Sequence, residues 1–98
     1  MPAYLINDME VLDPQGLDEY KKLSPATVAQ YGGKFLARGG EMKQLEGEWQ
    51  PERLVILEFP SIEQAQVWIN SPEYAAPRAI RQKAARSNIV VVEGIPPA

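Results

Sequence analysis

The sequence predicts an α+β fold whose strands and helices follow the order β-α-β-β-α-β. Short apolar stretches with the alternation of strands are separated by two longer stretches with helical spacing. Glycine pairs and prolines mark the ends of these stretches. A length of 98 residues, with 45% hydrophobic and 23% charged residues, fits a single domain over residues 1–98. This is the order of the ferredoxin-like sandwich, in which two helical segments pack on one face of four antiparallel strands.

The N-terminal part of the chain predicts a strand followed by a helix. Residues 3–10 alternate in polarity as a half-buried strand does. Asp13 and Pro14 then start the helix, because Asp caps a helix N-terminus and the first turn does not need the N–H that Pro lacks. We expect Pro25 to kink or restart this helix, since a proline inside a helix removes one hydrogen bond.

The middle of the chain predicts a long hairpin. The glycine pair at residues 32–33 ends the first helix, and residues 34–38 form the second strand. The stretch MKQLEGEWQPE, residues 42–52, is interpreted as a weak strand and a loop. The apolar stretch RLVILEF, residues 53–59, pairs back as the third strand.

The last part of the chain predicts a broken helical segment and a fourth strand. Ser61 begins a helix, and Gln64 completes a capping-box pattern with it. Pro72 and Pro77 are each expected to restart the helix. Residues 88–93, which include IVVV, predict the final strand.

The third strand is apolar on both faces, because Val55 points to one side and Ile56 to the other. Two helices cover only one face of such a sheet. A second copy packed face to face would bury the other face, at about 25 cal/mol per Å² of apolar surface. In the alternative, this face is only partly apolar and the tail at residues 94–98 folds over it. We expect a homodimer, in which Trp49 is a candidate for reaching the partner.

Composition excludes several classes of function. A net charge of −3 and a pI near 4.9 argue against a general nucleic-acid or anionic-membrane binder, since both need a basic surface. The chain has no Cys and no His, so we expect no metal site and no tightly bound cofactor. It also shows no apolar stretch long enough for a membrane span and no basic signal-peptide start, so we expect a cytoplasmic location.

Several motifs together resemble a small bacterial family known as domain of unknown function 1330. They are YGGKFLARGG, LEG, RLVILEFPSIEQAQVWINSPEY, the segment around Arg81, and VVVEG, and the resemblance runs from Tyr4 to Gly94. It implies the dimeric α/β-barrel superfamily and the same face-to-face homodimer. It implies no reaction, and related barrels include monooxygenases, isomerases and haem-handling proteins. The absence of His weakens the haem-handling branch.

Arg38 and Glu58 are the candidate catalytic residues. Arg38 shares a strand face with Leu36, and Glu58 shares one with Ile56, so a suitable register would bring the two side chains together. A guanidinium in an apolar cavity can bind a carboxylate or enolate oxygen, and a desolvated carboxylate near it can move a proton. In the alternative, the two residues form a structural ion pair or reach solvent.

A second set of candidates surrounds the helix restart in WINSPEYAAPRAIR. Four residues could wall a ligand pocket with aromatic faces and anion-binding donors: Trp68, Tyr74, Arg78 and Arg81. In the alternative, the aromatic residues belong to the core and the arginines are solvated.

The sequence observations together favour a small-molecule-binding domain of unknown function, with a small organic anion as a possible ligand. The alternative is a cofactor-independent enzyme, isomerase-like or monooxygenase-like, acting on a small anionic or carbonyl-bearing substrate.

Overall fold

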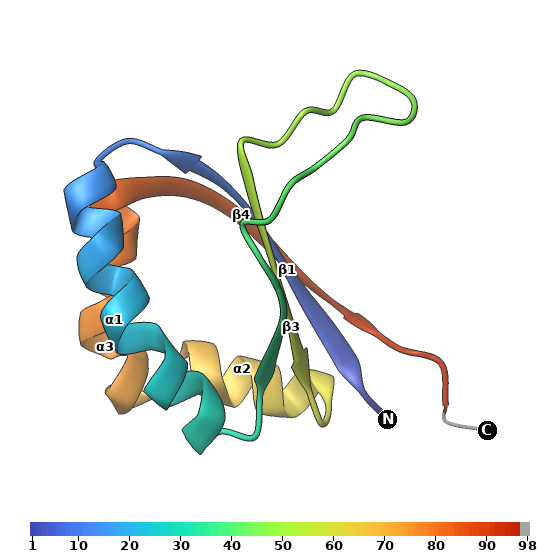
Figure 1. Cartoon of the computed structure of the whole chain (residues 1–98). Helices are drawn as coiled ribbons and strands as arrows, with labels where there is room; N and C mark the ends of the chain where they lie inside the picture. The colour runs from blue at the N-terminus through green and yellow to red at the C-terminus, as the bar shows by residue number, and fades with distance from the viewer. Residues whose placement is uncertain (97–98) are drawn as a thin grey trace.

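The strands form one four-stranded antiparallel sheet in the order β2-β3-β1-β4, and all the helices lie on one side of it (Figure 1). A computed structural model describes residues 1–96, so the end of the predicted tail, residues 97–98, lies outside the described residues. The elements are β1 (Ala3–Val11), α1 (Pro14–Gln30), β2 (Lys34–Arg38), β3 (Arg53–Phe59), α2 (Ile62–Ile69), α3 (Pro72–Ala84) and β4 (Ala85–Glu93). The predicted βαββαβ, ferredoxin-like order is confirmed, with its second helical segment divided into α2 and α3.

Alternation along the strands separates a helix-facing face from an outer face. Leu5 of β1 lies opposite Leu57 of β3 and Val91 of β4, and the first two are buried beneath the helices. The residues between these positions, such as Ile56, point to the other side and keep part of their surface exposed. The core therefore lies entirely between the helices and one face of the sheet.

Helix α1 is continuous, and the predicted kink or restart at Pro25 is wrong. The helix runs from Pro14 to Gln30 and buries Leu17, Tyr20 and Val28 against the sheet. This continuous buried stripe outweighs the one backbone hydrogen bond that a proline removes. Gly32 then ends the helical turn with a left-handed φ of 79°, as the sequence predicts.

Serine caps explain where the second helical segment divides. The side chain of Ser61 accepts a hydrogen bond from the backbone N–H of Gln64, and that of Ser71 accepts one from Tyr74. Helix α3 therefore starts at Pro72, as predicted. The second predicted restart, at Pro77, is wrong, because Pro77 is buried within an unbroken helical stripe.

The segment between β2 and β3 contains no strand, so the weak strand predicted in residues 42–52 is wrong. It extends beyond the sheet as a loop (Figure 1). Nearly all of it is exposed, so it offers no apolar face that pairing would bury. Trp49 is attached to the sheet through its Nε1, which donates to Asp8 Oδ2 at 2.9 Å. In residues 1–96, no helix has the length and apolarity that a membrane crossing needs.

Candidate functional site

The candidate site is a narrow pocket between α1 and the helix-facing side of the sheet. About 20 Å³ is open to the centre of a water molecule, which is room for roughly one water. Most of its wall is apolar or aromatic, and its polar side chains are few. The lining residues with polar groups are Asn7, Tyr20, Lys21, Ser24, Arg38, Arg53, Trp68 and Tyr74. None of the residues that line it is Asp or Glu.

A β-bulge places Arg38 in this pocket. Phe35 pairs with Leu57, but Ala37 then pairs with Ile56 and Arg38 with Val55. This irregularity turns Arg38 onto the face of Phe35, whereas regular alternation would leave it on the face of Leu36. The guanidinium carbon accordingly lies 4.7 Å from the centre of the Phe35 ring.

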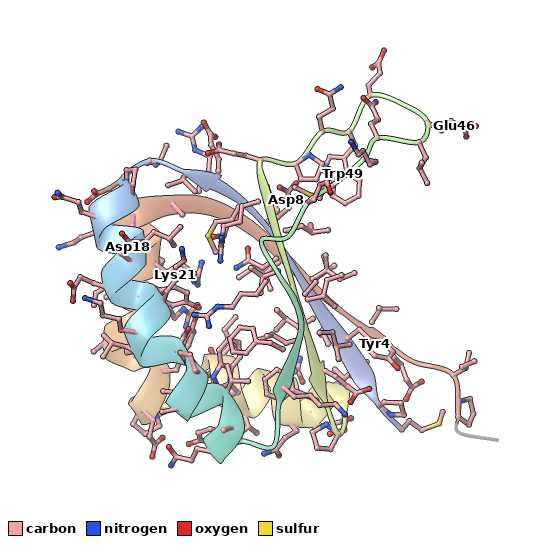
Figure 2. All side chains as sticks on the ribbon, viewed as in Figure 1. Tyr4, Asp8, Asp18, Lys21, Glu46 and Trp49 are labelled. Carbon is pink, nitrogen blue, oxygen red and sulfur yellow. The ribbon has the colours of Figure 1, made fainter. Side chains whose placement is uncertain are left out.

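Pro25 explains the hydrogen bond that fixes Arg38. In a regular helix, the N–H of residue 25 would donate to the carbonyl of Lys21, but proline has no N–H. Arg38 Nη2 donates to this carbonyl oxygen at 2.7 Å. Arg38 thus spans the gap between β2 and α1, and its other N–H groups are left for further partners. In Figure 2, Lys21 marks the stretch of α1 where this contact lies.

Glu58 lies on the outer face, so the predicted meeting of Arg38 and Glu58 is wrong. Glu58 pairs in register with Lys34 and Tyr4, and its Oε2 lies 3.0 Å from Lys34 Nζ. Figure 2 shows Tyr4 on this outer side, away from the helices. Register and the bulge are together the physical reason. Lys34 lies opposite Glu58, four residues or about 13 Å along the strand from Arg38, and the bulge turns Arg38 to the opposite face. Within one chain, the two residues form no common site.

Arg53 is a pocket residue that the sequence analysis missed. It is the first residue of β3 and lines the pocket next to Arg38. Its Nε is buried without a hydrogen-bond partner among the described residues. Burial, and then the charge of Arg38, lower the pKa of Arg53 from its usual value. The stretch RLVILEF contained a signal, because alternation places Arg53 on the same strand face as Val55, Leu57 and Phe59, which are buried.

Tyr20 and Tyr74 form a buried pair of hydroxyl groups in the pocket wall. Their Oη atoms lie 2.5 Å apart, and Arg81 Nε donates to Tyr74 Oη at 3.2 Å. Burial and the neighbouring Tyr74 raise the pKa of Tyr20 far above its usual value, so its hydroxyl is neutral at physiological pH. The ring of Trp68 lies against that of Tyr74, with centroids 4.1 Å apart.

The structure brings three of the four predicted ligand-binding residues together. Trp68 and Tyr74 line the pocket, and buried Arg81 supports Tyr74 from behind. Arg78 lies elsewhere, at the junction of α2 and α3, where its Nη1 is 3.4 Å from the carbonyl oxygen of Ile69. The fourth residue is therefore not part of this pocket.

Asn7 is a second residue that the sequence analysis missed. It lies in the middle of β1 on the helix-facing side, and only 5% of it is exposed. Its Oδ1 is buried and has no hydrogen-bond partner in the part of the chain that the structure describes. An Asn inside a strand of alternating apolar residues is the signal that could have identified it. Over residues 1–96, no three acidic, His or Cys side chains gather as ligands for a metal ion.

Comparison with solved structures shows where this fold occurs. RPA0582 of Rhodopseudomonas palustris, a protein of unknown function, matches with a TM-score of 0.75 and 22% identity over 98% of this chain and 84% of that one. SnoaB of Streptomyces nogalater, a cofactor-independent oxygenase, matches with a TM-score of 0.66 and 11% identity over 98% of this chain and 95% of that one. An antibiotic biosynthesis monooxygenase matches with a TM-score of 0.55 and 14% identity, over 98% and 100% of the two chains.

At these identities the structural likeness shows the fold alone, which this chain shares with SnoaB and with the antibiotic biosynthesis monooxygenase. No curated protein matches the sequence. The family profile for a domain of unknown function, DUF1330, matches residues 2–95, which is nearly the whole chain. The chain therefore belongs to the DUF1330 family.

Proposed function

We propose that this protein binds a small organic anion in the pocket between the sheet and the helices, and that it acts as a homodimer. The observation that carries the proposal is the pair formed by Arg38 and Arg53 in a pocket without a lining carboxylate. Arg53 is partly buried, Arg38 is exposed beside it at the pocket mouth, and the two like charges repel each other unless an anion neutralises them. A carboxylate fits the planar donor geometry of a guanidinium.

The outer face of the sheet supports the homodimer. Leu36, Val90 and Val92 expose half or more of their surface there, and Tyr4 and Ile56 are partly exposed beside them. An apolar patch of this kind marks an interaction surface on a small protein. A second copy of the chain can cover this patch with the same face of its own sheet, because a two-fold symmetric dimer pairs identical surfaces.

An enzymatic function is the second candidate. It is favoured by the buried hydroxyl pair of Tyr20 and Tyr74, which could donate a hydrogen bond to a bound carbonyl. The likeness to SnoaB, described as a cofactor-independent oxygenase, is an analogy of fold for such chemistry. Glu58 is not assigned a part in it, because Glu58 lies on the other face of the sheet. Turnover of a bound acid, lost in Tyr74→Phe with binding retained, would establish this candidate.

A thermal-shift screen with small organic acids tests the binding function, followed by calorimetry of the best acid. Arg38→Ala should weaken binding by tenfold or more, on the order of one lost charge-assisted contact. Arg86→Ala is the matched control, because Arg86 is an exposed arginine on β4 that pairs with Glu10. An acid whose affinity is unchanged in Arg38→Ala, or equally reduced in Arg86→Ala, would contradict binding in this pocket.

A further inference from the structure

We infer that the ligand is a short hydroxy acid, whose carboxylate is bound by Arg38 and Arg53 and whose hydroxyl donates a hydrogen bond to Asn7. This inference rests on the proposed function and makes it more specific, because it names a second polar group on the ligand. It depends on three features of the pocket: its unpaired arginines, its unpaired amide, and the apolar surface between them.

The two arginines are unpaired on the helix-facing side. All the salt bridges of the described residues involve other cations, and Arg53 Nε has no partner. Arg38 uses one N–H on the Lys21 carbonyl and keeps the others. Together the two groups can donate several hydrogen bonds to one carboxylate, which is the contact that planar guanidinium groups make best.

Asn7 supplies the complementary signal, an acceptor without a donor. Its neighbours in register are Val55 of β3 and Ile89 of β4, which offer no polar atom from their side chains. A buried amide oxygen left unpaired destabilises a fold unless something else satisfies it. A hydroxyl group on the ligand would satisfy Asn7 Oδ1, whereas a second carboxylate would repel it.

Register places the two polar groups a short ligand's length apart. Arg38 pairs with Val55, and Val55 pairs with Asn7 on its other side, so the three residues form one row across the sheet. Neighbouring strands lie about 4.8 Å apart, so the outer two backbones of this row are separated by about 10 Å. Their side chains span part of that distance, and the body of the ligand crosses the apolar side chain of Val55.

The closed pocket limits the size of the ligand. With space for about one water, the pocket admits an organic acid only if a side chain moves outward. Arg38 is exposed at the mouth, and its hydrogen bond to Lys21 is the only one its side chain makes within the described residues. Its guanidinium can therefore turn about this one contact toward an incoming carboxylate, while the buried Asn7 stays fixed. A body of three to six carbons, on the order of the 10 Å span, matches this opening.

Calorimetry with straight-chain ω-hydroxy acids of about three to six carbons, each compared with its deoxy acid, tests the inference. At one chain length or more, the hydroxy acid should bind about tenfold more tightly than the deoxy acid, as one satisfied buried hydrogen bond allows. Asn7→Leu should abolish this preference while leaving the affinity for the deoxy acid within about threefold of the wild-type value. It should also raise the melting temperature of the free protein, because it removes an unpaired buried amide.

A second variant covers the case in which leucine fills the pocket. Asn7→Ala leaves more room, and it should abolish the same preference. If no hydroxy acid binds more tightly than its deoxy acid, or if the preference survives in Asn7→Ala, the hydroxy-acid inference is wrong. In that case the proposed function stands as long as the deoxy acids still depend on Arg38. If no acid binds at any length, the proposed function itself is wrong.

Gly39 provides an independent test of the role of Arg53. A Cβ added at Gly39 would collide with Arg53 Nη1, and the backbone there has a positive φ of 70°. Gly39→Ala should displace the Arg53 guanidinium and weaken binding of every acid by tenfold or more, about as much as Arg53→Met does. Gly40→Ala is the matched control, because a Cβ there meets nothing within 4 Å. Acid binding that survives unchanged in Arg53→Met would exclude Arg53 from the site.

Discussion

The two faces of the sheet differ in how they hold charged and apolar side chains. On the outer face, the charge of Glu58 is paired with Lys34 at 3.0 Å, while valines such as Val90 remain exposed. On the helix-facing side, the apolar residues are buried, while Arg38 and Arg53 have no carboxylate partner among the described residues. An exposed apolar face is typical of a surface that binds another protein, and cations without a partner in a pocket are stabilised by a bound anion. Under the proposed function, the outer face serves assembly and the helix-facing side binds the ligand.

The largest expected effect is on assembly through the outer face. Val90→Lys should raise the dissociation constant of the dimer on the order of 100-fold or more, because the two-fold axis brings two ammonium groups into an apolar interface. The stability of each folded chain should change little, since Val90 is 61% exposed in the single chain. Sedimentation across a dilution series measures the effect.

Val67→Lys is the matched control for this measurement. Val67 is also a half-exposed valine, at 51%, but it lies on α2 on the other side of the molecule. It should leave the assembly unchanged. A wild-type protein that is monomeric at micromolar concentration, or a Val90→Lys variant that dimerises as well as Val67→Lys, would remove the assembly half of the comparison.

On the helix-facing side, Tyr74→Phe should lower the free energy of unfolding by about 1–3 kcal/mol, because it leaves Tyr20 and Arg81 without their shared partner. The control on the outer face is Tyr4→Phe, which should change it by less than about 0.5 kcal/mol. Denaturant unfolding of both variants measures the difference. Equal effects at the two positions would mean that the hydroxyl pair contributes no more than a surface hydroxyl.

A smaller effect is expected at Pro25, which positions Arg38 through the Lys21 carbonyl. Pro25→Ala restores an N–H that can donate to this carbonyl, so Arg38 loses its anchor. Affinity for the best-binding acid should fall several-fold, roughly one neutral hydrogen bond, while the free energy of unfolding stays the same or rises. In an Arg38→Ala background, Pro25→Ala should have no further effect on affinity. Additive losses would show that Pro25 acts by another route.

The same residues show what the sequence could and could not predict. Strand alternation predicted the faces of β1 and β3 correctly, because a period of two is fixed wherever one face is buried. It failed at β2, where the bulge between Phe35 and Ala37 moved Arg38 to the other face. No local pattern in KFLAR reveals that bulge, since it depends on how β2 pairs with β3. The expected Arg38–Glu58 pair failed for this reason and because the register sets Lys34, four residues before Arg38, opposite Glu58.

Proline and the interior polar residues show a different limit. Pro25 predicted a broken helix, but tertiary packing kept α1 continuous and gave the freed carbonyl to a distant arginine. Trp68 and Tyr74 were correctly expected near one another, because their spacing places them around a short helix junction. Arg53 and Asn7 were visible as polar residues on apolar strand faces. Only the three-dimensional arrangement shows that they are unpaired.

The smallest expected effect comes from a contact that belongs to neither face. Tyr31 Oη donates to Glu73 Oε1 at 2.5 Å, which joins the end of α1 to the start of α3. This hydrogen bond lowers the pKa of Glu73 below 4.5 and raises the pKa of Tyr31 above 10.0. A lowered carboxyl pKa stabilises the fold above pH 4.5, and this contribution is lost as the pH falls through the lowered value. A raised phenol pKa stabilises it below pH 10.0, and that contribution is lost as the pH rises through the raised value.

Melting temperatures of the wild-type protein and Tyr31→Phe should therefore differ by a small, constant amount between pH 4.5 and pH 10.0, and converge outside that range. The melting temperature of Glu73→Gln should likewise approach that of the wild-type protein as the pH falls below 4.5, because this variant lacks the carboxyl group that titrates in the wild-type protein. Both positions are exposed, so added salt should shrink the difference further. A difference that persists unchanged into acid would mean that Tyr31 stabilises the helix pair by packing alone. Tyr4→Phe alone would then measure how much an exposed tyrosine hydroxyl contributes to the free energy of unfolding.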